Sequence, residues 1–346
     1  MRMMIFAVAL VVVIFCTSAI ARQADYDQDI VLTTTGGKIE GSLLMPANGV
    51  KPPVVLIIAG SGATDRDGNT VGLKGKNDSL KMLAASMAQA GVASVRFDKR
   101  GIAGSAEAVT SAASEADLRF ETYVQDAVAW IRLLKADVRF SGVAMLGHSE
   151  GSLIAMLAAQ QEAVKAYISV AGPAKNAADV LRWQLQGKLS PALAASNEEI
   201  LSALQAGKTY AEVPPELKIL YRASVQPYLI SWFRYTPEKE IAKLTCPVLL
   251  IQGDKDIQVD TAQLTALKLA KPDAESLLIH NMNHVLKIIV NDTTQQMASY
   301  TDPALPLAPE LTKGLNSFLL DRLKSNLRSN VKSNLMTSRL PYKAMP

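Results

Sequence analysis

The sequence predicts an α/β fold in which helices cover both faces of a mostly parallel central sheet. Three observations predict it. Short, continuously apolar segments such as residues 54–58 have the pattern of strands that are buried on both faces. Segments with helical periodicity alternate with these strands from residue 80 onward. At residues 147–151 a glycine-rich turn directly follows one such strand and precedes a helical segment.

The predicted elements follow each other in a regular order. Residues 30–34 and 38–45 lie on either side of Gly36-Gly37 and predict the two strands of a hairpin. Beyond the hairpin, apolar runs predict strands at 54–58, 92–97, 143–146, 166–170, 248–251 and 277–279. Helical periodicity predicts helices at 80–90, 123–134, 152–160 and 261–269.

One long segment interrupts this alternation. The 75 residues from 172 to 246 separate two predicted strands, although a simple crossover needs only one helix. The segment contains seven of the 19 aromatic residues of the chain, and it predicts helices, broken by prolines, around 177–187, 197–206 and 215–223. We expect residues 173–242 to form a helical lid over a site. The alternative is a helical buttress with a small core of its own.

The first 21 residues have the features of a signal peptide. Arg2 supplies a positive start, residues 3–15 form an apolar run, and Ala19-Ile20-Ala21 offers small residues for cleavage. The run is shorter than the roughly 18 to 20 residues that span a bilayer, and a single N-terminal membrane anchor is the alternative. We therefore expect an exported protein, periplasmic or secreted. Cleavage after Ala21 leaves Cys246 as the only cysteine, which excludes an internal disulfide.

The positive charge is concentrated at the C-terminus. Of the 36 Lys and Arg residues, six lie in residues 322–346 and one is Arg2, which leaves 29 against 32 acidic residues in 3–321. A basic nucleic-acid-binding body is therefore excluded. Three four-residue repeats cover residues 324–335, and as a helix they would place a basic stripe beside an apolar one. We expect a dispensable tail, with contact to an anionic membrane surface as the alternative.

The strongest functional signal is Gly147-His148-Ser149-Glu150-Gly151. Glycines on both sides of the serine permit a sharp, strained turn between a strand and a helix. Such a turn presents the serine hydroxyl above the sheet at the helix N-terminus, as a nucleophile requires. An ordinary glycine-rich loop is the alternative interpretation.

With this motif the chain resembles the α/β-hydrolase superfamily over about residues 29–320. Residues 97–101, with Gly104-Ser105, are similar to the D-x-R-G-x-G-x-S segment of the family, and residues 58–62 stand where it keeps its oxyanion loop. Residues 64–69 continue that loop as in a bacterial esterase-like, serine-aminopeptidase-like subgroup. The common His-Gly pair of the loop is replaced by Ala59-Gly60. The resemblance implies a hydrolase core of residues 22–172 and 243–321, which the helical insertion divides.

A nucleophilic serine needs a base, and the chain has three histidines. His148 lies within the turn of the nucleophile itself. His280 ends a predicted strand, where we expect a half-buried structural role. His284 follows in the loop after the last strand, where the resemblance places the base, and it is our candidate.

The base needs an acid that orients it. Gly253-Asp254-Lys255-Asp256 follows the strand at 248–251, and the resemblance implies that Asp256 is this acid. Asp254 is the competitor and is expected to act on the turn. The order Ser149, Asp256, His284 is the order of the α/β-hydrolase triad.

The remaining site residues concern the oxyanion and the acyl group. The backbone N–H of Glu150 and that of Ser61 or Gly62 are expected to form the oxyanion hole. Trp232 and Phe233 are expected to form the acyl wall. No metal and no cofactor is expected, because Asp65-x-Asp67-x-Asn69 lacks the glycine and glutamate of a calcium loop and no phosphate-binding or dinucleotide motif occurs.

The sequence therefore predicts an exported serine hydrolase that cleaves small-molecule carboxylic esters through an acyl-enzyme. No acidic cluster is assigned to a free α-amino group, although the carboxylate of Glu150 lies next to the nucleophile. An aminopeptidase or amidase with the same triad is one alternative. A non-catalytic binding protein of the same fold is the other.

Overall fold

The computed structural model describes residues 27–47, 51–109, 115–290 and 293–337, and from residue 324 only the helical backbone. The predicted signal peptide and residues 338–346 of the predicted tail lie outside the described residues. None of the described helices is both long enough and apolar enough to cross a membrane.

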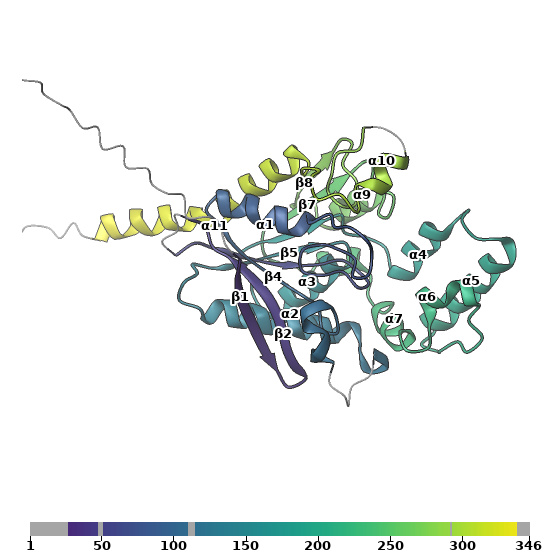
Figure 1. The fold of residues 1–346 in the computed structure, drawn as a ribbon. Helices are drawn as coiled ribbons and strands as arrows, with labels where there is room; N and C mark the ends of the chain where they lie inside the picture. The colour runs from purple at the N-terminus through teal and green to yellow at the C-terminus, as the bar shows by residue number, and fades with distance from the viewer. Residues whose placement is uncertain (1–26, 48–50, 110–114, 291–292, 338–346) are drawn as a thin grey trace, which may run out of the picture.

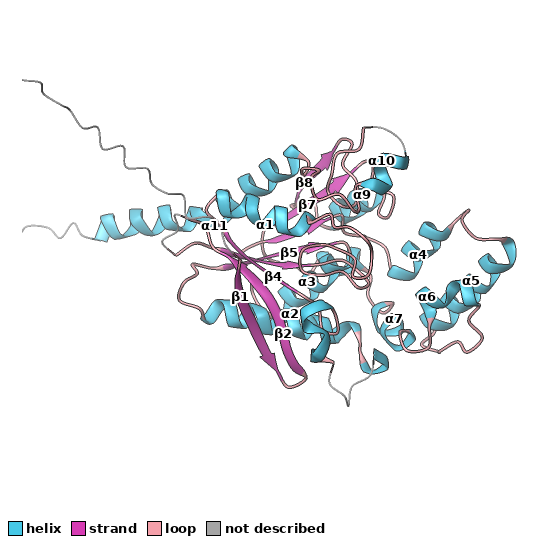
Figure 2. Ribbon diagram, in the orientation of Figure 1, coloured by secondary structure: helices cyan, strands magenta, loops and turns pink. Residues whose placement is uncertain are grey.

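The described residues form one eight-stranded sheet (Figures 1 and 2). Its strands are β1 Gln28–Thr34, β2 Gly37–Leu44, β3 Val54–Ile58, β4 Ala93–Phe97, β5 Val143–His148, β6 Tyr167–Val170, β7 Val248–Gly253 and β8 Glu275–Ile279. Their order across the sheet is β1-β2-β4-β3-β5-β6-β7-β8. The hairpin β1–β2 and the pair β2–β4 are antiparallel, and all other neighbours are parallel. The predicted α/β fold is confirmed, with element ends shifted by three residues or fewer outside the insertion.

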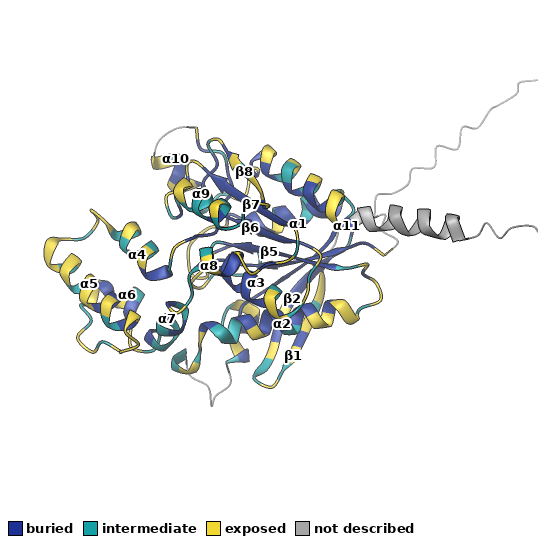
Figure 3. Cartoon of the chain, turned by 180° about the vertical axis from the view of Figure 1, so that it is seen from behind, coloured by how far each residue is buried: buried dark blue, intermediate teal, exposed yellow. Residues whose placement is uncertain are grey.

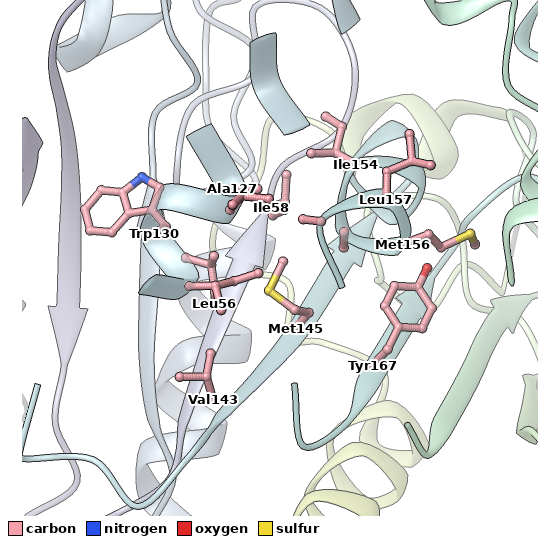
Figure 4. Packing of buried hydrophobic residues seen from close by; sticks show 14 of the residues in the cluster. Leu56, Ile58, Ala127, Trp130, Val143, Met145, Ile154, Met156, Leu157 and Tyr167 are labelled. Carbon is pink, nitrogen blue, oxygen red and sulfur yellow. The ribbon is translucent and has the colours of Figure 1, made fainter. Parts of the chain in front are cut away.

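Helices cover both faces of the sheet. They are α1 Ser79–Gln89 and α11 Pro309–Thr337 on one face, and α2 Phe120–Ala136, α3 Glu150–Gln161 and α9 Thr261–Ala270 on the other. Strand β3 shows why both faces need cover. Its residues 54, 56 and 58 pack with α2 and α3, and residues 55 and 57 pack with α1 and α11. Figure 4 shows the first of these clusters, and Figure 3 shows the buried strands between helices that are exposed on their outer sides.

The segment between β6 and β7 is helical. It contains α4 Ala177–Leu185, α5 Pro191–Gln205, η3 Pro215–Leu217, α6 Lys218–Tyr221, α7 Gln226–Trp232 and α8 Pro237–Ile241. Helix α5 begins six residues before the predicted start, and the sequence did not predict α7 and α8. Prolines explain these differences. Each of the three helices has a proline in its first turn, where the missing N–H costs nothing, so these prolines begin helices and do not interrupt them.

Most of this segment has a hydrophobic cluster of its own, which includes Leu201, Tyr221 and Phe233. Helix α8 differs, because Ile241 is buried in the main core beside α2 and α3. We define the insertion as residues 173–236, which ends before α8. In Figure 1 its helices α4 to α7 lie beyond one end of the sheet.

Helix α11 closes the described chain. Its residues Leu311, Leu315, Leu319 and Leu323 are buried on the sheet at the spacing of one helix face. Its backbone remains helical to Thr337 through the basic repeats, and in Figure 1 this last part extends away from the body.

Candidate active site

Ser149 occupies a strained turn between β5 and α3. Its φ of 53° and ψ of −123° are unusual for a residue with a side chain. The turn depends on the flanking glycines. A Cβ at Gly147 would lie 2.3 Å from the carbonyl oxygen of Gly151, and a Cβ at Gly151 would lie 2.3 Å from that of Ile58. The glycine spacing therefore serves the local geometry that the sequence predicts.

His284 and Asp256 come together from the loops after β8 and β7. His284 Nδ1 lies 2.8 Å from Asp256 Oδ2, and both side chains are buried. The backbone N–H groups of Gln258 and Val259 donate to the other carboxylate oxygen at 2.8 and 2.9 Å. Burial alone would raise the pKa of the Asp256 carboxyl, but His284 and these N–H groups hold that pKa below its ordinary value.

The aspartate sets the tautomer of His284. Because an ionised carboxylate only accepts hydrogen bonds, Nδ1 of His284 carries the proton that bonds Asp256. Nε2 is then left with a free electron pair. This is the form in which histidine acts as a general base.

His148 connects this histidine to the serine turn. Its Nε2 lies 2.8 Å from the carbonyl oxygen of His284, to which it donates, and the two rings are 4.8 Å apart. Burial lowers the pKa of His148 to about 3, with the neighbouring charge of His284 as the next cause. His148 is therefore neutral. Because it directly precedes Ser149, its hydrogen bond holds the His284 loop beside the serine turn.

A second histidine–aspartate pair lies close by in sequence. His280 Nδ1 is 2.6 Å from Asp254 Oδ2, but 80% of the His280 side chain is exposed. The expectation of a half-buried role for His280 was wrong, because the chain turns outward at the end of β8. Asp254 also accepts the backbone N–H of Asn281, so it acts on the turn as expected.

A cavity of about 420 Å³ opens in front of Ser149. The cavity is lined by Ser149, by Glu150, which follows it in the chain, and by Ser61 and Gly62 of the oxyanion loop. The described main-chain hydrogen bonds include none from the N–H groups of these three residues. A Cβ at Gly60 would lie 3.2 Å from Ser149 Cβ, so the loop passes directly against the serine. These amides are therefore candidate donors to an oxyanion.

The insertion supplies much of the cavity wall. Trp232 lines the cavity and stacks on Phe120 with ring centroids 5.7 Å apart and planes 2° apart. Phe233 is not among the described residues that line the cavity. It is 7% exposed and packs in the cluster of the insertion itself. Trp232 packs against the same cluster. Of the two residues expected in the acyl wall, only Trp232 is among the described residues that line the cavity, so the sequence-based placement of Phe233 in the wall is corrected.

Sequence analysis did not identify Lys99 and Tyr228. Lys99 Nζ lies 2.7 Å from Glu150 Oε2 and 2.6 Å from the carbonyl oxygen of Gly60, and Tyr228 OH donates to Glu150 Oε1 at 2.5 Å. A lysine two residues after the end of the buried strand β4 is the sequence signal that could have indicated Lys99. No comparable signal marks Tyr228, because its partner depends on how the insertion packs.

The loop at residues 64–69 is held by hydrogen bonds. The Asp65 carboxylate accepts the N–H groups of Asp67 and Asn69, and Arg66 binds Asp98 through two nitrogens at 2.7 and 2.9 Å. Among the described residues, no group of three His, Cys, Asp or Glu side chains could hold a metal ion.

Comparisons with known proteins agree with this architecture. Esterase EstD of Thermotoga maritima is 27% identical over 263 residues, which is 75% of this chain and 60% of EstD. The chain thus spans about three-fifths of the length of this relative. The structure of Est1E from Butyrivibrio proteoclasticus is similar with a TM-score of 0.56 at 20% identity, over 86% of this chain and 99% of Est1E. A puromycin-hydrolysing peptidase of Mycobacterium tuberculosis has a TM-score of 0.53 at 18% identity, over 86% of this chain and 40% of that one.

The structural similarities establish the fold. The family described as serine aminopeptidase, S33, matches residues 71–288, which include the serine turn, the insertion and the His284 loop. The resemblance inferred from the sequence motifs is thereby confirmed, and the chain belongs to this serine aminopeptidase (S33) family of α/β hydrolases.

Proposed function

We propose that the chain is a serine esterase in which Ser149 is the nucleophile, His284 the base and Asp256 the residue that orients the base. One observation carries the proposal. The buried hydrogen bond from His284 to Asp256 lies beside a serine that is held in a strained turn and faces a cavity. The relatives named esterases support the same reaction class.

The reaction follows from this geometry. Ser149 Oγ transfers its proton to His284 Nε2 and attacks the ester carbonyl carbon. The N–H of Glu150 and that of Ser61 or Gly62 stabilise the oxyanion, an effect worth about 3 to 4 kcal/mol for one donor. His284 then protonates the departing alkoxide. Water, activated by the same histidine, hydrolyses the acyl-enzyme.

The charges around the cavity favour esters over aminoacyl substrates. Among the described residues that line it, the carboxylates are Glu115 and Glu150. Lys99 and Tyr228 each donate a hydrogen bond to the Glu150 carboxylate. Arg222 binds the Glu115 carboxylate, with Nε at 2.9 Å from Oε2. The hydrogen bond from Arg222 lowers the pKa of the Glu115 carboxyl. Neither carboxylate is left to receive a free α-amino group.

The cavity wall favours uncharged, bulky apolar substrates. Helices α4, α6 and α7 contribute Leu181, Leu220 and Leu229 to it, and Trp232 adds an aromatic surface. One structure of Est1E contains ferulic acid, which supports an ester of a small molecule as the class of substrate. We therefore propose an ester with an apolar or aromatic acyl group.

We also propose that the enzyme is exported. The basic start at Arg2, the apolar run of residues 3–15 and the small residues that end at Ala21 support this. N-terminal sequencing of protein from the periplasm or the culture medium tests it. A start at Arg22 is expected, and full-length protein confined to the membrane fraction would support the anchor instead.

A substrate panel tests the activity. Residues 22–346 should hydrolyse p-nitrophenyl esters and leave aminoacyl anilides nearly untouched. Ser149→Ala should abolish hydrolysis and fluorophosphonate labelling, and His284→Ala should lower kcat at least about a thousandfold. His280→Ala is the matched control, because it removes the exposed histidine, and it should keep full activity.

Other outcomes would select the alternatives. Faster turnover of an aminoacyl anilide than of any ester would favour an aminopeptidase or amidase. A folded protein that neither labels nor turns over substrate would favour a binding protein. Activity that survives in Ser149→Ala would contradict the proposed nucleophile.

A further inference from the structure

Lys99 is buried between the oxyanion loop and the residue that follows the nucleophile. Its side chain is 3% exposed and that of its partner Glu150 is 2% exposed. The ammonium also lies 5.3 Å from the centre of the Tyr123 ring. Removing both charges from water is costly, and the carboxylate oxygen satisfies only one of the three N–H donors of the ammonium, so the carbonyl oxygen of Gly60 supplies a second acceptor. This contact, at 2.6 Å, ties the ammonium to a peptide of the oxyanion loop.

The contact fixes the orientation of one peptide. In a trans peptide the C=O of one residue and the N–H of the next lie in one plane and point in opposite directions. Because Lys99 binds the carbonyl oxygen of Gly60, it also fixes the direction of the N–H of Ser61. The Gly62 N–H belongs to the next peptide, whose Ser61 carbonyl oxygen accepts the Thr64 hydroxyl at 2.8 Å, but this hydrogen bond is exposed, so water competes for it. The φ of Gly62, 69°, also lies in the region that glycine enters freely.

We infer that Lys99 is a positioning residue that holds the Gly60–Ser61 peptide so that Ser61, rather than Gly62, provides the second oxyanion N–H. This inference rests on the proposed esterase function. Lys99 touches neither the reacting atoms nor the oxyanion in this scheme. It acts through the peptide, so its effect should appear only where negative charge develops on the substrate oxygen.

The insertion takes part in this arrangement through Tyr228. Its hydroxyl donates to the Glu150 oxygen that Lys99 leaves free. Burial and the charge of Glu150 raise the pKa of Tyr228 well above its ordinary value, so the hydroxyl remains a donor. The orientation of the oxyanion peptide thus depends on a contact from α7, in addition to the core of the hydrolase.

The first experiment removes the pair and measures kinetics. Lys99→Met alone would leave the buried Glu150 carboxylate without a positive charge beside it. The test is therefore Lys99→Met/Glu150→Gln, in which the amide oxygen still accepts the Tyr228 hydroxyl. The matched control is Lys135→Met/Glu162→Gln, which changes a surface pair at 3.0 Å in the same way. Circular dichroism establishes that both variants are folded.

The expected result is a loss of transition-state stabilisation. In the Lys99 variant kcat for a p-nitrophenyl ester should fall about 10- to 100-fold, because losing one donor outright typically costs about 100- to 1000-fold. KM should change less than about threefold, and the affinity for a trifluoromethyl ketone, whose adduct carries the oxyanion, should fall with kcat. The control should match the wild type. A folded variant with wild-type kcat, or one in which only KM rises, would overturn the inference.

The second experiment needs no variant of the pair. In a crystal structure of the wild type inactivated by diethyl p-nitrophenyl phosphate, the phosphoryl oxygen should accept from the N–H groups of Ser61 and Glu150. An oxygen bound to the N–H of Gly62 instead would overturn the inference while leaving the esterase proposal intact. A wild-type protein that neither reacts with this reagent nor hydrolyses any ester would contradict both the inference and the esterase proposal.

Discussion

Replacing His148 by glutamine should flatten the dependence of stability on pH. The His148 ring is buried, and its Nε2 donates to the carbonyl oxygen of His284. Its Nδ1 has no hydrogen-bond partner among the described residues. Glutamine can place its own Nε2 at the position of the histidine donor, but it does not titrate. The substitution thus removes the proton-binding site and retains the hydrogen bond to His284.

The size of the effect follows from the pKa. Burial, with His284 as the next cause, lowers the pKa of His148 from 6.5 to about 3. Between these values the unfolded chain binds a proton that the folded chain does not, so the free energy of unfolding falls as the pH falls. The slope is about 1.36 kcal/mol per pH unit. At pH 5, which lies 1.5 units below 6.5, the loss relative to pH 8 is therefore about 2 kcal/mol.

Urea unfolding of wild type and His148→Gln at pH 8, 7, 6 and 5 measures this difference. All other titrating groups are common to the two proteins. Between pH 8 and pH 5 the wild type should lose about 2 kcal/mol more than the variant, and most of this difference should develop below pH 6.5. Equal losses would refute the reasoning, since they would mean that His148 binds its proton equally well in both states.

Further predictions concern the cavity wall and the tail. Trp232→Ala should raise the relative rate for bulky acyl esters over acetyl esters, because it enlarges the cavity. Phe233→Ala should instead leave relative rates unchanged and lower the free energy of unfolding by about 3 kcal/mol or more, because it empties part of the insertion cluster. The opposite pattern would reverse these roles. Deleting residues 325–346 should leave esterase activity and thermal stability intact, because the truncation retains every described buried side chain of α11, up to Leu323. A soluble but inactive truncation, or lost binding to anionic vesicles, would contradict a dispensable tail.

The sheet could be predicted from the sequence because its signals are local. A strand buried on both faces must be apolar throughout, as residues 54–58 are, and that pattern survives without knowledge of its neighbours. The approach of Asp256 to His284 also follows, because the carboxyl ends of parallel strands meet at one edge of the sheet. The glycines around Ser149 are required by contacts within and beside their own turn.

The insertion could not be predicted at this level because its side chains find partners far away in sequence. Trp232 and Phe233 are adjacent and chemically similar, yet Trp232 lines the cavity, whereas Phe233 is buried in the cluster of the insertion and does not line it. Helix α7 also brings Tyr228 to Glu150, 78 residues away in the chain. Residue type indicates that such side chains are buried, but it does not indicate against what.

The two histidine–aspartate pairs show what structure adds to a motif. Asp254 and Asp256 end the same strand, and His280 and His284 follow the next one, so either aspartate could pair with either histidine on chemical grounds. The backbone decides between them. The N–H groups of Gln258 and Val259 hold Asp256 in the interior, whereas that of Asn281 holds Asp254 at the surface. Only the inner pair is sheltered from water beside the serine turn. A hydrogen bond in such a place orients a base far more effectively than the same bond in solvent, where water competes for both partners.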